Sequence, residues 1–165
     1  MFVFLDTEFT NFVSPELLSL ALVSEDGQEF YVERTDYSID ACSEFVRATV
    51  LPLFGRVPGA ACTNEQLKKR VLHWLQHFPE PVNVIYDYAG DRDLLTTLLS
   101  SHPTAPATIG LKIPLGENVT SAPSFEIGVE RTYSAQWPRH HALADARALM
   151  AGYQAWRAFV VGVLA

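Results

Sequence analysis

Cysteine is scarce in this sequence, and basic residues are outnumbered by acidic ones. Only two of the 165 residues are cysteine, Cys42 and Cys62, and their spacing matches no zinc-ligand pattern. We therefore expect two reduced cysteines, as in a cytoplasmic protein, and no disulfide scaffold. Twelve lysines and arginines stand against nineteen aspartates and glutamates, which gives a formal net charge of −7. This balance argues against nonspecific duplex binding through a basic surface, but it is compatible with a small nucleic-acid substrate held by metals in a pocket.

Long apolar runs are also missing. No run reaches the roughly 18 residues that a membrane-spanning helix needs, and no basic stretch followed by an apolar run marks a signal peptide. We therefore expect no membrane partner and a cytoplasmic location. The apolar C-terminal stretch AFVVGVLA is expected to pack as the end of a helix. With 48% hydrophobic and 19% charged residues, the composition is that of a globular chain, and we expect one domain over residues 1–165.

The hydrophobic pattern predicts an α/β domain. Residues 2–5 are expected to form a short buried strand, and residues 17–23 and 28–34 a hairpin around a turn at 25–27, which together give three antiparallel strands. The later elements that the pattern predicts are a helical segment at 41–54, a helix from a capping box at 63–66 to about 77, a strand at 82–86, a helix at 91–100, a loop at 103–124 with a short strand at 109–113, and a helix from 142 to about 161. Strands followed by alternating helices and strands favour one mixed sheet flanked by helices.

The first strand leads into two carboxylates in the stretch FVFLDTEF. Side chains alternate along a strand, so Asp6 and Glu8 point the same way if the strand continues through Glu8. Carboxylates this close repel unless a proton or a cation lies between them, and magnesium prefers such oxygen ligands. Alternatively, Asp6 ends the strand and Glu8 points into water.

A second acidic group follows the strand at 82–86 in the stretch VNVIYDYAGDRDLL. It comprises Asp87, Asp91 and Asp93. The carboxyl ends of sheet strands are where α/β proteins commonly bind ligands. Alternatively, Asp87 or Asp91 simply caps the next helix, where the helix dipole favours a carboxylate.

A third group lies in the stretch WPRHHALADA. On a continuous helix His141 would share a face with Asp145, but the proline before the histidines indicates a loop, which places His140 at the entrance to the helix. A histidine in that position can lean over the face of Asp145 and accept a proton from water. Alternatively, both histidines lie on the surface and Asp145 pairs with Arg139 or Arg147.

In their order along the chain and in their residue patterns, these three groups resemble the motifs of the DEDDh exonucleases. This family is a branch of the ribonuclease-H-like superfamily that includes ribonuclease T and the proofreading exonucleases. DTEF matches the first motif. DRDLL matches the Asp-x-x-Leu-Leu pattern of the second, which selects Asp91 over Asp87 and Asp93. HHALADA matches the His-x-Ala-Leu-x-Asp-Ala pattern of the third, which selects His140 over His141.

The resemblance covers nearly the whole chain, with one departure. Family members often carry His-Asn shortly before the second-motif aspartate, where this chain has Tyr86-Asp87. The role of Asp87 is therefore open: it supplements the acidic cluster or touches the sugar. In its short length and its Tyr-Asp-Tyr sequence, the chain resembles a compact bacterial exoribonuclease subgroup of this family.

The resemblance implies a ribonuclease-H-like sheet and a metal-dependent 3′–5′ exonuclease that releases nucleoside monophosphates from single-stranded RNA or DNA, with RNA favoured. It implies two divalent cations, Mg²⁺ or Mn²⁺, about 4 Å apart. The implied metal ligands are Asp6, Glu8, Asp91 and Asp145, and His140 is the implied general base. Members are frequently dimers, so a homodimer is a further expectation.

The implied substrate-binding residues are Thr7, Phe9, Asp87 and His140. Phe9 is the candidate for stacking on the terminal base, unless it simply packs in the core. Arg131, Arg139 and the run 68–70 are candidates for phosphate contacts, although such a run is more often a solvated helix face. Two other functions remain open: a nucleic-acid-binding module on the same fold, and a phosphodiesterase for small substrates.

Overall fold

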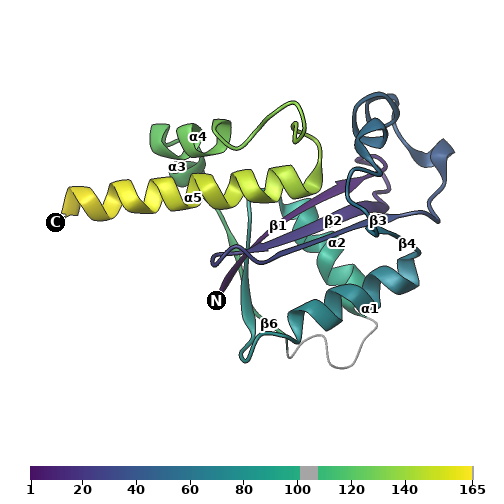
Figure 1. The fold of residues 1–165 in the computed structure, drawn as a ribbon, viewed down its shortest axis with the longest axis horizontal. Coiled ribbons are helices and arrows are strands. Elements are labelled where there is room, and N and C mark those ends of the chain that lie inside the picture. Colours follow the sequence, from purple (N-terminus) through teal and green to yellow (C-terminus); the bar gives the residue numbers. More distant parts are fainter. Residues whose placement is uncertain (101–107, 165) are drawn as a thin grey trace.

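The chain forms a mixed six-stranded sheet, as the computed structural model shows for residues 1–100 and 108–164 (Figure 1). The strand order is β4-β3-β2-β1-β5-β6. The first three strands pair antiparallel, and β5 and β6 then continue the sheet parallel to β1. This confirms the predicted α/β fold. The strands are β1 (Phe2–Phe9), β2 (Leu17–Ser24), β3 (Glu29–Arg34), β4 (Ala61–Cys62), β5 (Val82–Tyr86) and β6 (Ile109–Pro114).

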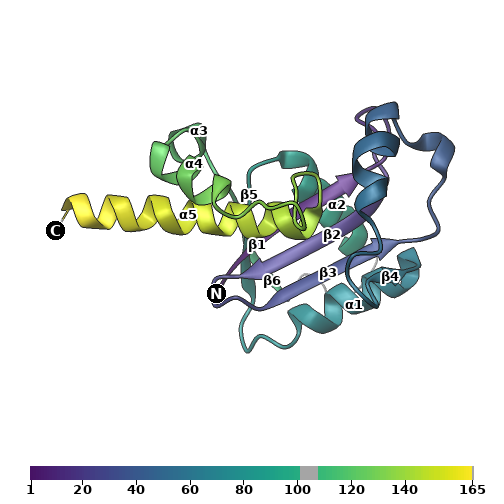
Figure 2. The same ribbon diagram turned by 45° about the horizontal axis from the view of Figure 1, so that its top comes forward.

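Helices cover both faces of the sheet (Figures 1 and 2). On one face lie α1 (Asn64–Leu75) and α2 (Ala89–Ser100); on the other α5 (Ala142–Leu164) crosses β1 and β2 and packs against α4 (Pro123–Glu130). Alternation along β1 divides the core between these layers: Val3 and Leu5 pack on the α1 and α2 side, whereas Phe4 packs on the α4 and α5 side. The same alternation decides where the polar residues at the end of β1 point.

Several predicted elements are confirmed. The hairpin, the strand β5 and the capping box that opens α1 lie where the sequence places them, and α5 begins at the predicted residue. Cys42 and Cys62 are both buried and free in the structure. Within residues 1–100 and 108–164, every helix falls short of the length and apolar character that crossing a membrane requires.

Other predictions are wrong in part. The segment 41–54 contains a π-helical stretch at Val46–Val50 followed by a 3-10 turn at Leu51–Leu53, in which Pro52 lacks the N–H donor of a regular helical turn. Residues 103–107 of the predicted loop at 103–124 lie outside the described residues. The short strand predicted at 109–113 is confirmed as β6. The rest of the segment is not only loop, because it holds the short helix α3 (Glu117–Thr120) and the first turn of α4.

The start of α4 and the end of α5 also differ from expectation. Pro123 occupies the first turn of α4, where proline is favourable because its missing N–H needs no partner. The C-terminal turns of α5 are helical but do not pack on the body of the protein, since Phe159, Val161 and Val163 are 60–67% exposed. The expectation that this apolar stretch packs is therefore wrong.

Two glycines allow α4 and α5 to touch. A Cβ atom on Gly128 would lie 2.6 Å from the carbonyl oxygen of Ala151 and 2.9 Å from the Cα atom of Gly152. Because both neighbours are backbone atoms, they cannot move aside as a side chain can. The replacement Gly128→Ala is therefore expected to lower the free energy of unfolding by about 1–3 kcal/mol, measured by chemical denaturation.

The matched control is Gly162→Ala near the exposed end of α5. A Cβ atom there meets nothing within 4 Å, so only the better helix propensity of alanine acts, with a gain of up to about 1 kcal/mol. Equal stability of the Gly128→Ala variant and the parent protein would contradict this account of the α4–α5 contact.

Candidate active site

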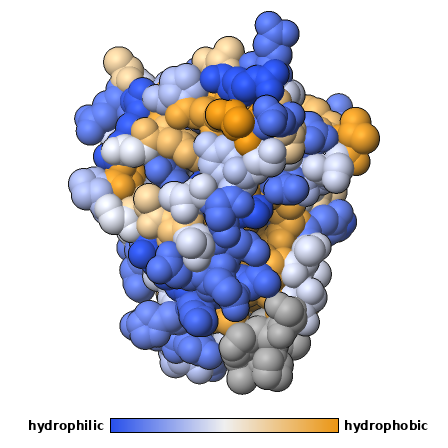
Figure 3. Space-filling view, turned by 90° about the vertical axis from the view of Figure 1, so that its right-hand side faces the viewer, coloured by the Kyte–Doolittle hydropathy of each residue, from blue (hydrophilic) through white to orange (hydrophobic). Residues whose placement is uncertain are grey.

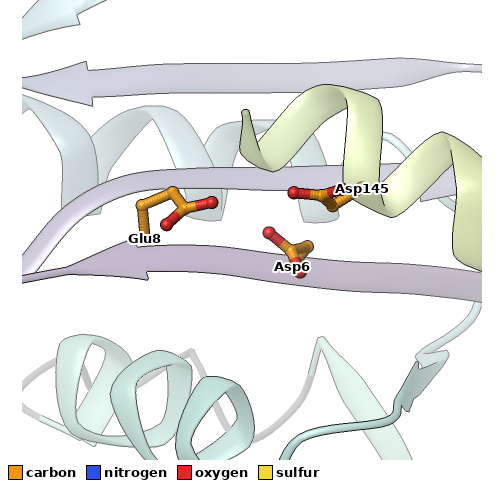
Figure 4. Close-up of side chains that lie close together, drawn as sticks. All are labelled: Asp6, Glu8 and Asp145. Atoms are coloured by element: carbon orange, nitrogen blue, oxygen red, sulfur yellow. The ribbon is translucent and has the colours of Figure 1, made fainter. Parts of the chain in front are cut away.

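Three carboxylates from distant parts of the chain meet beside the sheet. Asp6 and Glu8 alternate with Thr7 along β1, so they point toward the layer of α5, and Asp145 comes from the first turn of α5 (Figure 4). Each of the three offers an oxygen within 4.8 Å of an oxygen of the other two. This confirms that Asp6 and Glu8 share a face, and it brings the first and third motifs together.

Asp91 approaches the same place from the other side of the sheet. It is 2% exposed, and its Oδ1 accepts a hydrogen bond of 2.5 Å from Oγ1 of Thr7. Asp91 lines the same cavity as Asp6 and Glu8, but it lies outside the close group of three carboxylates. It is the third residue of α2, so it does not occupy the N-cap position.

Burial raises the pKa of every carboxyl group in this set. Burial, followed by the negative charges of its neighbours, raises the pKa of Asp6 well above its usual value. The same two causes raise the pKa of Glu8 to about 8. Burial raises the pKa of Asp91 to about 7, against the hydrogen bond from Thr7, and burial also raises that of Asp145. Without a cation, Glu8 and, in part, Asp91 therefore retain protons at neutral pH.

The donor set fits a hard divalent cation. All of the candidate ligands are carboxylates, which suit Mg²⁺ and Mn²⁺. Oδ2 of Asp6 is buried and has no hydrogen-bond partner within the described residues, so it is available to a ligand. A cation bound here would replace the protons and would remove the repulsion between the carboxylates.

Asp145 is held by two hydrogen bonds. Its Oδ1 accepts from the hydroxyl group of Tyr133 at 2.6 Å, and its Oδ2 accepts from the backbone N–H of His140 at 2.8 Å. These bonds fix the carboxylate against the end of β1. Tyr133 could not be predicted as a site residue from the sequence, because it lies in an irregular segment and belongs to none of the three motifs.

His140 stands at the entrance to α5, as predicted. Its backbone has a φ of 67°, in the left-handed region that few side chains adopt, and its side chain is exposed. The imidazole makes an edge contact with the ring of Phe45, with 5.0 Å between ring centroids. Such strain commonly marks functional positions, and here the hydrogen bond to Asp145 maintains it.

His141 has a different environment, and the alternative that both histidines lie on the surface is wrong. It is 1% exposed, stacks on Tyr31 at 4.7 Å and meets the edge of Trp137 at 5.2 Å. Neither ring nitrogen has a hydrogen-bond partner within the described residues, and burial lowers the pKa of His141 to about 4. It therefore acts as an uncharged core aromatic.

The two neighbouring arginines pair away from Asp145. Arg139 forms an ion pair with Glu130, and Arg147 forms one with Glu29 at 2.6 Å. The alternative in which Asp145 pairs with Arg139 or Arg147 is therefore wrong.

Two cavities meet at the site and share Asp6, Asp87, His140 and Asp145. The first, of about 610 Å³, we call the aromatic cavity. Its lining includes Phe9, Phe12, Phe45, Val46 and Tyr88. The second, of about 490 Å³, we call the acidic cavity. Its lining includes Phe125, Glu126, Glu130, Tyr133 and Arg139. Figure 3 views the molecule from the side toward which β1 runs and shows hydrophobic surface broken up by hydrophilic side chains.

Phe9 belongs to an open aromatic group rather than to the core. Its ring stacks on Tyr88 with 6.0 Å between centroids, and Phe12, which is 80% exposed, meets the edges of both rings. Of these aromatic residues, only Phe9 was predicted at the site; Phe12, Phe45 and Tyr88 were not. The sequence shows that these residues are aromatic, but it does not show that their side chains are exposed to solvent rather than buried in the core.

Of the residues predicted to contact phosphate, only Arg139 lies at the site. Arg139 lines the acidic cavity, with its guanidinium 4.4 Å from the ring centroid of Tyr133. Arg131 lines neither of the two cavities, and the run 68–70 lies on α1, across the sheet from α5. Asp87 is exposed and lines both cavities.

Comparisons with known proteins add no family to this picture. No protein-family model matches the chain, and no curated protein matches its sequence. The resemblance to the DEDDh exonucleases therefore rests on the sequence motifs.

The raised pKa values make the effect of a metal on stability depend on pH. Between about pH 4 and 8 the folded metal-free protein holds more protons on Glu8 and Asp91 than the unfolded chain does. Stability of the metal-free protein therefore falls as pH rises through this window, and a bound cation restores it. A metal at about 100 times its Kd adds about 2.7 kcal/mol, so we expect Mn²⁺ to raise the Tm by about 5–10 °C near pH 8.

Near pH 5 protons compete for the same oxygens, and the expected rise in Tm is less than about 2 °C. Thermal unfolding with Mn²⁺ or with chelator, at both pH values, measures the difference. The control variant Asp6→Asn, which removes one ligand, is expected to lose most of the rise near pH 8. Equal shifts at both pH values would show that the carboxylates do not bind the ion.

Proposed function

We propose that this protein is a metal-dependent 3′–5′ exonuclease of the DEDDh type that hydrolyses single-stranded nucleic acid, with RNA favoured, to nucleoside monophosphates. The observation that carries the proposal is the meeting of Asp6, Glu8 and Asp145, within 4.8 Å, beside an exposed histidine at the entrance to α5. A binding module needs no general base, so the histidine favours an enzyme.

In this proposal Asp6, Glu8 and Asp145, with Asp91 from the opposite side, hold two divalent cations. When bound, such a pair supplies a hydroxide nucleophile and stabilises the charge on the leaving oxygen. Thr7 orients the carboxylate of Asp91, and Tyr133 orients that of Asp145. Four carboxylates balance the charge of two divalent ions, so a phosphate group meets no net negative charge from the ligands.

His140 acts as the general base in this proposal. Its backbone is fixed by the carboxylate of Asp145, while its imidazole faces both cavities. The neutral imidazole accepts a proton from the attacking water and releases it to solvent, which its exposure permits. The aromatic cavity receives the terminal base on Phe9 and Tyr88, where stacking is worth about 1–3 kcal/mol and tolerates any base.

The test is incubation with a 5′-labelled single-stranded RNA oligomer and Mn²⁺ or Mg²⁺, with and without chelator. We expect a ladder that shortens from the 3′ end, nucleoside monophosphate as the product, and no reaction in chelator. An oligomer with a 3′-phosphate in place of the free hydroxyl serves as the control for the direction of attack. An oligomer that is retarded but left intact would contradict the proposal in favour of a binding module.

Turnover of a simple phosphate ester but not of an oligonucleotide would instead indicate a small-substrate phosphodiesterase. A cytoplasmic location belongs to the proposal and is supported by the two free buried cysteines, which are typical of a reducing compartment. Formation of a homodimer stays a prediction.

A further inference from the structure

We propose that the site is built for very short oligonucleotides of dinucleotide size rather than for long chains. This inference rests on the proposed function and deepens it, because it concerns which single-stranded substrates that site turns over best.

The first observation is the shape of the site. The aromatic and acidic cavities have similar volumes, about 610 and 490 Å³, and they meet at the residues that flank the reacting phosphate in the proposed function. Cavities of this size hold a ligand of several hundred daltons. One nucleoside on each side of a single phosphate therefore fills them, with Phe9 and Tyr88 on one side and Phe125 and Tyr133 on the other.

The second observation is the distribution of positive charge. All twelve lysines and arginines lie in the described part of the chain, and among them only Arg139 lines either cavity. Arg139 is already paired with Glu130 and packed over Tyr133. Proteins that follow a long single strand use a groove of positive charge along the backbone, and these two cavities lack one.

The third observation is the negative charge on the acidic cavity. Glu126 and Glu130 project from α4 into its lining, and Asp87 lines both cavities. A second or third phosphate of a longer strand that passes along α4 would meet these carboxylates and be repelled. Their oxygens instead suit hydrogen-bond donors, such as the exocyclic amino group of cytosine or a ribose hydroxyl.

These observations predict that the affinity for oligonucleotides depends only weakly on salt and does not increase with the length of the oligonucleotide. Affinity for single strands falls with salt in proportion to about 0.7 times the number of phosphates that the protein neutralises. With about one such contact, a rise from about 50 to about 200 mM salt should weaken binding only about threefold. With the same slope, six to ten phosphate contacts would weaken binding by about 300-fold to about 10⁴-fold over the same range.

Binding is measured by calorimetry with the His140→Ala variant, which keeps all four carboxylates, in the presence of Mn²⁺. The probes are a diribonucleotide and a dodecaribonucleotide of the same 3′ sequence. We expect Kd values within about threefold of each other and the shallow salt dependence given above. Affinity for the dodecanucleotide that is tenfold higher or more, with a steep salt dependence, would overturn the inference.

Turnover by the parent protein separates this inference from the proposed function. We expect kcat/KM for the dinucleotide to equal or exceed that for the dodecanucleotide. Faster turnover of the dodecanucleotide would overturn the inference and leave the exonuclease proposal intact. If neither is hydrolysed with either metal, the proposed function fails and this inference fails with it.

A charge reversal tests the role of the acidic cavity. The variant Glu126→Lys places a cation on α4 where a longer strand would pass, so we expect the dodecanucleotide-to-dinucleotide ratio of kcat/KM to rise about three- to fivefold. The matched control Glu80→Lys makes the same change in net charge at an exposed position before β5, at the opposite end of that strand from the site. An equal rise in both variants would show that only net charge matters, and would overturn the assignment to this cavity.

Discussion

Replacement of Asp145 by asparagine is expected to reduce hydrolysis by about 10³-fold or more while the fold is retained. The side chain keeps its size, but it loses the charge that binds a cation worth several kcal/mol of transition-state stabilisation. The metal-free variant is expected to stay within about 1 kcal/mol of the parent in stability. Asparagine can still accept the hydrogen bond from the backbone N–H of His140, and its amide N–H can donate to the hydroxyl oxygen of Tyr133.

Hydrolysis is measured with the labelled RNA oligomer, and stability by thermal unfolding in chelator. The matched control for loss of a carboxylate is the pair Asp91→Asn and Asp93→Asn on α2. Asp91 is buried beside Thr7, whereas the side chain of Asp93 is 64% exposed and paired with Arg92. We expect a severe loss for the first and a change of less than about twofold for the second, because surface ion pairs of this kind contribute little. Similar losses for both would contradict the assignment of the second motif.

Replacement of His140 by alanine is expected to lower kcat by about 10²–10⁴-fold, the range for loss of a general base. Stability and the rise in Tm with Mn²⁺ should stay close to those of the parent protein. The imidazole is exposed, and the hydrogen bond to Asp145 comes from the backbone N–H, which alanine also has. A loss of metal binding in this variant would show that His140 is a ligand rather than a base.

The neighbouring His141 provides the control. The variant His141→Phe keeps an aromatic ring between Tyr31 and Trp137 and removes two ring nitrogens that have no partner in the described structure. We expect its kcat to fall less than about tenfold, far less than the loss expected for His140→Ala. If kcat fell further in His141→Phe than in His140→Ala, the general base would be His141 rather than His140.

The parts of the site that follow a regular pattern could be predicted from the sequence. The period of a strand placed Asp6 and Glu8 on one face, and the proline before the histidines placed His140 on the loop that enters α5. Both follow from local geometry. The mixed sheet followed from the hairpin and the later alternation of strands and helices.

The parts that depend on tertiary contacts could not be predicted. Tyr133 reaches Asp145 only because α4 packs on α5 through Gly128 and Gly152, and nothing in the sequence around Tyr133 indicates that contact. Asp91 was predicted as a metal ligand and lines the same cavity as the other three carboxylates, but its hydrogen bond from Thr7 could not be predicted from the sequence. From the sequence alone, the exposed aromatic residues of the aromatic cavity could not be distinguished from core residues.

The most direct test of this account is a crystal structure with Mn²⁺ and a nucleoside monophosphate, in which anomalous scattering locates the metal. The account predicts manganese bound by Asp6, Glu8 and Asp145, a second ion or its water shell at Asp91, and the phosphate between the metals and His140. Manganese bound elsewhere, with these carboxylates still protonated and the nucleotide away from His140, would contradict it.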